Sequence, residues 1–172
     1  MNDEPYTSWM DSLHAFPRLA EGIGQFMASF ASLERLLYEL YGKILGNKGD
    51  AAIAMLGHIE SFSIKLTAME NFLPYCPLDA EKLNIVAKFL GRARDINTFR
   101  NTLAHGIYLS DENATTVDVL AYATTTGRKA KIIRLTSDLL SGETDKILAL
   151  RKEIQSVFFP QFSGAHRPKH IR

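Results

Sequence analysis

The feature that most constrains the fold is a long apolar repeat over residues 18–45. Apolar side chains recur there at steps of three and four residues, a spacing that marks one face of an amphipathic helix. Gly46, Asn47 and Gly49 follow the repeat and predict the end of that helix. The apolar positions that mark this face are Ile23, Phe26, Met27, Phe30, Leu33, Leu37, Leu40 and Ile44.

Three more helices are predicted between residues 50 and 105. Asp50 is expected to cap a short helix that ends near residue 58, and Ser61 is expected to cap a third helix. The prolines in residues 74–77 predict a break. A long helix over residues 79–105 follows, and Gly106 stands where a helix C-terminus favours glycine.

The pattern then changes from helical spacing to period two. Short segments rich in β-branched residues at 107–109, 117–122 and 131–135 predict strands, and polar turns separate them. Thr136 or Ser137 is expected to cap a final helix that ends near residue 159, with Leu140, Ile147, Leu148, Ile154 and Phe158 buried. The predicted fold class is therefore mainly α: a helical bundle of about five helices, with a small antiparallel β-hairpin or sheet inserted before the last helix.

Composition limits the number of domains and the kinds of partner. A chain of 172 residues fits one domain, which we expect over residues 1–162, with residues 163–172 as a disordered basic tail. The formal net charge is +1, so no global field attracts nucleic acid or a membrane surface. Cys76 is the one cysteine, which excludes an internal disulfide and a cysteine-built metal site. The polar N-terminus and the absence of a spanning apolar run predict a soluble, cytoplasmic protein with no membrane partner.

One polar stripe stands out on the long helix. On a helical wheel at about 100° per residue, Arg94, Thr98, Asn101 and His105 fall within about 60° of one another, opposite the apolar face. Arg100 lies between the two faces, about 140° from His105 on the same helix. One copy of the helix would aim these two side chains at one atom poorly, whereas two copies meeting at a symmetric interface would combine them.

The residue types in this stripe suit phosphate chemistry. A guanidinium group matches two phosphate oxygens with parallel hydrogen bonds, and a histidine exchanges protons near neutral pH. Asn101 can orient either side chain or a substrate hydroxyl. The alternative is structural, because such a cluster at a helix end also satisfies carbonyl groups and complements the helix dipole.

The run Arg100-Asn101-Thr102-Leu103-Ala104-His105 resembles the signature of the HEPN superfamily, an arginine, a polar residue and then a histidine four to six residues after the arginine. The run Phe30-Ala31-Ser32-Leu33-Glu34 in the first helix is also similar to that superfamily, as is the layout of residues 18–160. The resemblance implies a helical bundle that dimerises through the motif helix. It further implies a metal-independent endoribonuclease, often a toxin or an RNA-processing or defence factor, that needs no cofactor.

Carried over residue by residue, the resemblance assigns roles to the motif. His105 would assist the attack of the ribose 2′-hydroxyl on the adjacent phosphate, and Arg100 would hold the phosphate and stabilise its charge. Asn101 would orient both, while Arg94 and Thr98 would contact RNA. Other members of the superfamily keep the fold without cleavage, so a non-catalytic module that binds a nucleotide, an antitoxin or another protein partner is the alternative.

Several other charged residues have more than one interpretation. Glu34 and Glu39 either face the motif and tune His105 or are solvated charges, and the second interpretation is favoured. Arg92 lies near the apolar face, and burial against a partner subunit would explain it. The hairpin has a basic edge that consists of Arg128, Lys129, Lys131 and Arg134. These side chains either contact RNA phosphates or prevent edge-to-edge aggregation of the strands, and the second interpretation is favoured.

Overall fold

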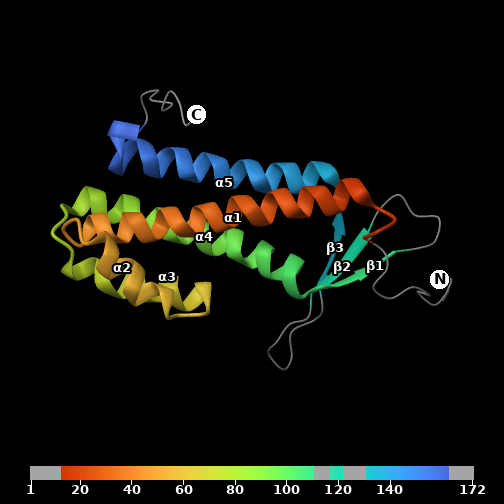
Figure 1. Cartoon of the computed structure of the whole chain (residues 1–172), viewed down its shortest axis with the longest axis horizontal. Helices are drawn as coiled ribbons and strands as arrows, with labels where there is room; N and C mark the ends of the chain where they lie inside the picture. Colours follow the sequence, from red (N-terminus) through yellow and green to blue (C-terminus); the bar gives the residue numbers. More distant parts are fainter. Residues whose placement is uncertain (1–12, 111–116, 122–130, 163–172) are drawn as a thin grey trace, which may run out of the picture. The chain divides into compact units, whose positions relative to one another are not determined.

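The chain is mainly helical in the computed structural model, which describes residues 13–110, 117–121 and 131–162 (Figure 1). Within these ranges there are five α-helices and a three-stranded antiparallel sheet between the fourth and the fifth. This confirms the predicted fold class. The elements are α1 (Pro17–Ile44), α2 (Gly49–Gly57), α3 (Phe62–Phe72), η1 (Leu73–Tyr75), α4 (Ala80–His105), β1 (Ile107–Leu109), β2 (Val117–Ala121), β3 (Lys131–Leu135), α5 (Ser137–Phe158) and η2 (Pro160–Phe162).

The chain forms two compact units. The first unit takes its described residues from 1–30 and 95–145, and the second unit from 31–94 and 146–172. Helices α1, α4 and α5 each run from one unit into the other. The expectation of one domain over residues 1–162 stays a prediction, and the predicted basic tail lies outside the described residues.

The core of the first unit is built by the start of α1, the end of α4 and the sheet. Phe26 is fully buried and meets Phe99 edge to face, with the ring centroids 5.2 Å apart. Such a pair contributes about 0.5–1.5 kcal/mol beyond its buried area. The buried apolar residues of this unit are Leu19, Phe26, Phe30, Ile96, Leu103, Val117, Val119, Leu135 and Leu140.

The second unit buries the rest of the apolar faces of α1, α4 and α5 together with α2 and α3. Tyr41 and Phe72 meet edge to face at 6.1 Å, as Phe89 and Phe158 do at 6.5 Å. The prediction that Leu148 is buried was wrong, because the side chain is exposed. On α5 the buried positions of this unit are Ile147, Leu150, Ile154 and Phe158, and residue 148 is turned about 100° away from residue 147. Among the described helices, none combines the length and the apolar content that a bilayer crossing requires.

Side chains cap some of the helices and not others. The Lys82 amide donates to Asp79 Oδ1 at 2.8 Å, so Asp79 caps α4. Of the two candidates for α5, Thr136 is the cap, since its Oγ1 accepts from the Leu139 amide at 3.1 Å. Ser61 stands at the N-cap of α3 without a side-chain cap bond. The expectation for Asp50 was wrong, because α2 begins at Gly49 and the carboxylate lies inside its first turn, where it complements the helix dipole.

Gly46 and Asn47 end α1 as the sequence predicts. Both have left-handed backbone angles, with φ of 84° and 63°. Glycine adopts this region without a steric penalty and asparagine tolerates it better than most residues. The turn lets Gly42 approach Gly49 so closely that a Cβ on Gly42 would lie 2.4 Å from the Gly49 Cα.

The sheet has the order β1-β2-β3, with β2 in the centre (Figure 1). Val119 pairs with Tyr108 of β1 and with Ile133 of β3, and Val117 pairs with Leu135. Because side chains alternate along a strand, these residues lie on one face of the sheet. Val117, Val119 and Leu135 are fully buried there, so this face belongs to the core of the first unit.

Gly106 joins α4 to the sheet at a position where a residue with a side chain would not fit. Gly106 stands directly after the last residue of α4, as predicted. Among the described glycines only Gly46 has a positive φ, so a left-handed backbone is not the reason for a glycine at position 106. A Cβ on Gly106 would lie 2.3 Å from Val119 Cγ1 and 2.5 Å from the Thr102 carbonyl oxygen. Both distances are well inside van der Waals contact, and the carbonyl is backbone that cannot rotate away.

Substitution of Gly106 by alanine should therefore destabilise the protein. We expect Gly106→Ala to lower the free energy of unfolding by about 2–3 kcal/mol, the upper range for overpacking. The measurement is urea unfolding followed by circular dichroism. Gly91 is the matched control, because it lies inside α4 with no atom within 4 Å of an added Cβ. Gly91→Ala should raise the free energy of unfolding by about 0.5–1 kcal/mol. Equal effects of the two substitutions would contradict the steric explanation.

Candidate functional site

Three of the five predicted site residues lie exposed near the C-terminal end of α4. Thr98, Asn101 and His105 are all exposed, and they occupy successive turns of the helix. His105 is the last residue of α4. Their side chains are therefore accessible to a ligand in the first unit.

Arg100 lies half-buried beside this row. Its Cζ atom is 5.7 Å from the centroid of the Phe30 ring, a distance at which a guanidinium is attracted to the ring face. Its Nη1 donates a hydrogen bond of 3.2 Å to Asn101 Oδ1. Its Nε is buried without a hydrogen-bond partner among the described residues. The aromatic ring and the amide together fix where the guanidinium lies.

The bond between Arg100 and Asn101 changes the geometry expected from the wheel. Arg100 and His105 leave the helix about 140° apart, but Asn101 leaves it only about 40° from His105, one turn earlier. The bond places one Arg100 nitrogen beside the Asn101 amide, so the guanidinium contacts a residue of the polar stripe that also contains His105. A guanidinium has five N–H donors, so the bond to Asn101 leaves capacity for an anion.

The end of α4 is fixed by contacts with the residues that follow. The last four carbonyl groups of a helix lack partners within it. The Gly106 amide donates to the Thr102 carbonyl at 2.9 Å, and the Tyr108 hydroxyl donates to the Leu103 carbonyl at 2.6 Å. Burial raises the pKa of Tyr108, so its hydroxyl stays protonated and remains a donor. These bonds hold the turn that carries His105.

Arg94, predicted to contact RNA, belongs to the second unit and has partners there. Its Nη2 donates to Glu70 Oε2 at 2.6 Å and weakly to Thr67 Oγ1 at 3.5 Å. Phosphate would have to compete with the Glu70 carboxylate for this guanidinium. Thr98, the other predicted RNA contact, belongs to the first unit.

Arg92 has a partner within its own chain, so a partner subunit is not required to explain it. Its Nη1 pairs with Glu153 Oε2 at 2.6 Å, and both side chains are about half-exposed. The same bond lowers the pKa of Glu153. A salt bridge of this exposure contributes roughly 0–1 kcal/mol.

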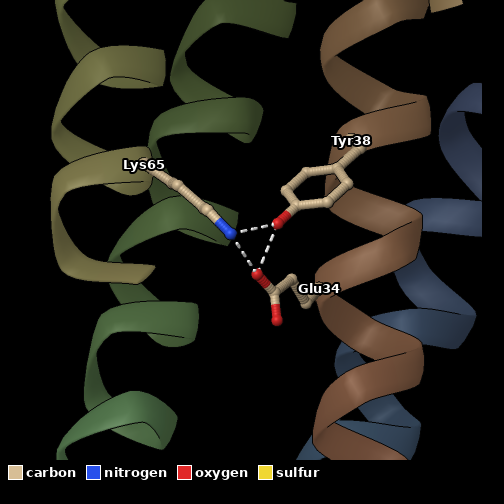
Figure 2. Close-up of polar contacts among 3 residues, drawn as sticks. All are labelled: Glu34, Tyr38 and Lys65. Carbon is tan, nitrogen blue, oxygen red and sulfur yellow. Dashed lines mark hydrogen bonds and ion pairs between the residues drawn. The ribbon is translucent and has the colours of Figure 1, made fainter. Parts of the chain in front are cut away.

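The favoured interpretation of Glu34 and Glu39 as solvated charges was right for one of them. Glu39 forms an exposed pair with Arg35 at 3.2 Å. Glu34 is instead part of a half-buried cluster with Tyr38 and Lys65, which Figure 2 shows with the three head groups pointing toward one another. Sequence reasoning missed this cluster, although Glu34 and Tyr38 stand one helical turn apart and Lys65 interrupts the apolar face of α3.

Lys65 is the most buried charge of this cluster. It is 7% exposed, and its Nζ donates to Glu34 Oε1 at 2.7 Å and to Tyr38 Oη at 2.5 Å. The Tyr38 hydroxyl also donates to Glu34 Oε1. Burial alone would lower the pKa of Lys65, but its bonds to Glu34 and Tyr38 outweigh burial and raise it. Burial and the Glu34 carboxylate raise the pKa of Tyr38. The cluster ties α3 to α1 within the second unit.

Neither a metal-binding cluster nor a described pocket involves the predicted site residues of α4. In the part of the chain that is described, no group of three or more His, Cys, Asp or Glu side chains could hold a metal ion. A pocket of about 440 Å³ is lined by residues 15–19 and 135–137. None of the predicted site residues lines that pocket. The residues Arg128 and Lys129 of the predicted basic edge lie outside the described ranges, whereas Lys131 is exposed and Arg134 pairs with Asp118 at 3.2 Å.

Comparison with known proteins found no matching family model, no matching curated protein and no matching solved structure.

The Lys65 cluster should make the protein sensitive to alkali. The pKa values of Tyr38 and Lys65 are raised from ordinary values of 10.0 and 10.5, so the unfolded chain loses these protons first as pH rises. Stability from these groups is fully present below about pH 10 and is lost as pH rises through the folded values. We expect the free energy of unfolding to fall above pH 10 in urea titrations, and Tyr38→Phe to reduce that slope. Tyr75 is 83% exposed, so Tyr75→Phe is the matched control and should leave the slope unchanged. Equal slopes for wild type and Tyr38→Phe would contradict the expectation.

Proposed function

We propose that this chain is a metal-independent endoribonuclease of HEPN type that acts on RNA as a homodimer. The observation that carries the proposal is the hydrogen bond from Arg100 to Asn101, one helical turn before the exposed His105. It joins a phosphate-binding group to the polar stripe that also contains a residue able to transfer protons. The motif that this run of residues resembles uses the same three residue types.

The proposed reaction uses the ribose 2′-hydroxyl as the nucleophile. His105 accepts its proton while the 2′-oxygen forms a bond to phosphorus and the bond from phosphorus to the 5′-oxygen breaks. The leaving 5′-oxygen takes up a proton from water, His105 later releases its proton to solvent, and the products are a 2′,3′-cyclic phosphate and a free 5′-hydroxyl. Arg100 stabilises the charge that develops on the phosphate oxygens, and Asn101 orients the guanidinium. The ring of Phe30 limits how far that guanidinium can move away.

The other parts of the proposal concern binding and context. Thr98 contacts the RNA beside the motif, and Arg94 does so once its pair with Glu70 opens. We propose a cytoplasmic protein with an antitoxin or another protein partner, consistent with toxin-like and defence members of the superfamily that the motif resembles. No cofactor takes part in the proposed reaction.

A non-catalytic interaction module is the second candidate. The formal net charge of +1 favours it, because general RNA-binding proteins are usually more basic. Large apolar side chains are also exposed in the second unit, among them Ile64 at 59% and Tyr75 at 83%. In that function the α4 residues would bind a nucleotide or a protein without cleaving RNA.

The test of cleavage uses purified protein, mixed single-stranded RNA and a metal chelator. Wild type should cleave and leave cyclic phosphate ends. His105→Ala and Arg100→Ala should each lower kcat by about 100-fold or more, the usual effect of losing an acid–base or charge-stabilising group.

Two exposed residues of the second unit provide matched controls. His58→Ala removes an exposed histidine, and Arg35→Ala removes an arginine whose one described ion pair is to Glu39. Both variants should cleave like wild type. Absence of cleavage by a folded, dimeric wild type would reject the ribonuclease and favour the interaction module. Loss of activity in the controls would reject a specific role for Arg100 and His105.

The homodimer can be tested at the exposed face of α4. Ala104 is exposed beside His105, so a charged side chain there should not disturb the fold of one chain. Ala104→Glu should give a monomer in light scattering coupled to gel filtration, because a buried unpaired carboxylate opposes an interface. Ala20, an exposed alanine of α1, is the control, and Ala20→Glu should remain a dimer. Dimeric Ala104→Glu would place the interface elsewhere.

A further inference from the structure

Tyr108 links the sheet to the last turn of α4, three residues beyond His105. It stands in the middle of β1, where it pairs with Val119 of β2. Its hydroxyl donates a hydrogen bond of 2.6 Å to the Leu103 carbonyl oxygen. The tyrosine is half-buried, so its ring is held by the core of the first unit. The position of the hydroxyl is therefore set by the sheet and not by the helix.

The Leu103 carbonyl has no hydrogen-bond donor within α4, and the Tyr108 hydroxyl takes the place of one. In a continuing helix it would accept from the amide of residue 107, but Ile107 already belongs to β1. A carbonyl without a partner at a helix end attracts water, and the last turn frays. Asn101 and His105 flank Leu103 in this turn, so fraying would separate His105 from the Arg100–Asn101 pair.

We propose that Tyr108 is a positioning residue, whose hydroxyl holds the last turn of α4 so that His105 stays in place beside Arg100 and Asn101. The inference rests on the proposed ribonuclease function and deepens it. Tyr108 does not touch the phosphate and acts through the Leu103 carbonyl. Its removal should therefore affect the chemical step more than RNA binding, because misplacement of a catalytic group by about 1 Å can cost up to about 100-fold in rate.

The test compares Tyr108→Phe with Tyr38→Phe. Each variant loses one hydroxyl that donates a hydrogen bond within the chain, to the Leu103 carbonyl in the first and to the Glu34 carboxylate in the second. Tyr38 lies in the second unit and outside the proposed machinery, so it controls for a general loss of stability. For Tyr108→Phe we expect kcat to fall about tenfold with KM within twofold of wild type. Tyr38→Phe should keep both constants.

Amide hydrogen exchange supplies a readout that needs no activity. The Gly106 amide bonds to the Thr102 carbonyl in the same turn. Tyr108→Phe should speed its exchange about tenfold, while Tyr38→Phe should leave it unchanged. Faster exchange at Gly106 with an inactive wild type would reject the ribonuclease and retain the ordering role of Tyr108. An active wild type whose kcat and Gly106 exchange are both unaffected by Tyr108→Phe would overturn the inference alone.

Discussion

The first unit depends on the close approach between the end of α4 and the central strand of the sheet. Gly106 permits it, because Val119 Cγ1 occupies the space where a side chain would begin. Once the backbones are this close, β1 can start directly after the helix and Tyr108 can reach back to the Leu103 carbonyl. The same contact that closes the core therefore fixes the orientation of the turn that carries His105.

The Lys65 cluster of α1 and α3 and the Arg100–Asn101 pair of α4 differ in how deeply their charged groups are buried. Lys65 is nearly fully buried, and such a charge is tolerated only with partners, which Glu34 and Tyr38 provide. Arg100 is half-buried, and its guanidinium rests on an aromatic face and an amide, neither of which neutralises it. The Lys65 ammonium group donates its hydrogen bonds to the Glu34 carboxylate and the Tyr38 hydroxyl. The Arg100–Asn101 pair keeps a positive charge available for an anion.

Much of the fold could be predicted because periodicity and cap residues act locally. The apolar repeat of α1, the stop at Gly46 and Asn47, and the cap Thr136 are all properties of neighbouring residues. Leu148 was predicted as buried although the burial of α5 follows Ile147 and Leu150. The cluster of Lys65 could not be predicted, because it joins residues of two helices. Lys65 is 27 residues from Tyr38 and 31 residues from Glu34 in the sequence.

For the candidate site, the sequence suggests which residues could take part but not how they are arranged. A helical wheel describes where side chains leave the backbone, and for Arg100 and His105 it gives directions that diverge. The head group of a long flexible side chain can lie far from its Cα atom. Its position depends on the nearest hydrogen-bond acceptor and on the surface against which the side chain packs. Here the acceptor is the neighbouring Asn101 and the surface is Phe30, from another helix. The polar residue after the arginine thus has a physical role in this chain, because its amide oxygen accepts a hydrogen bond from the guanidinium.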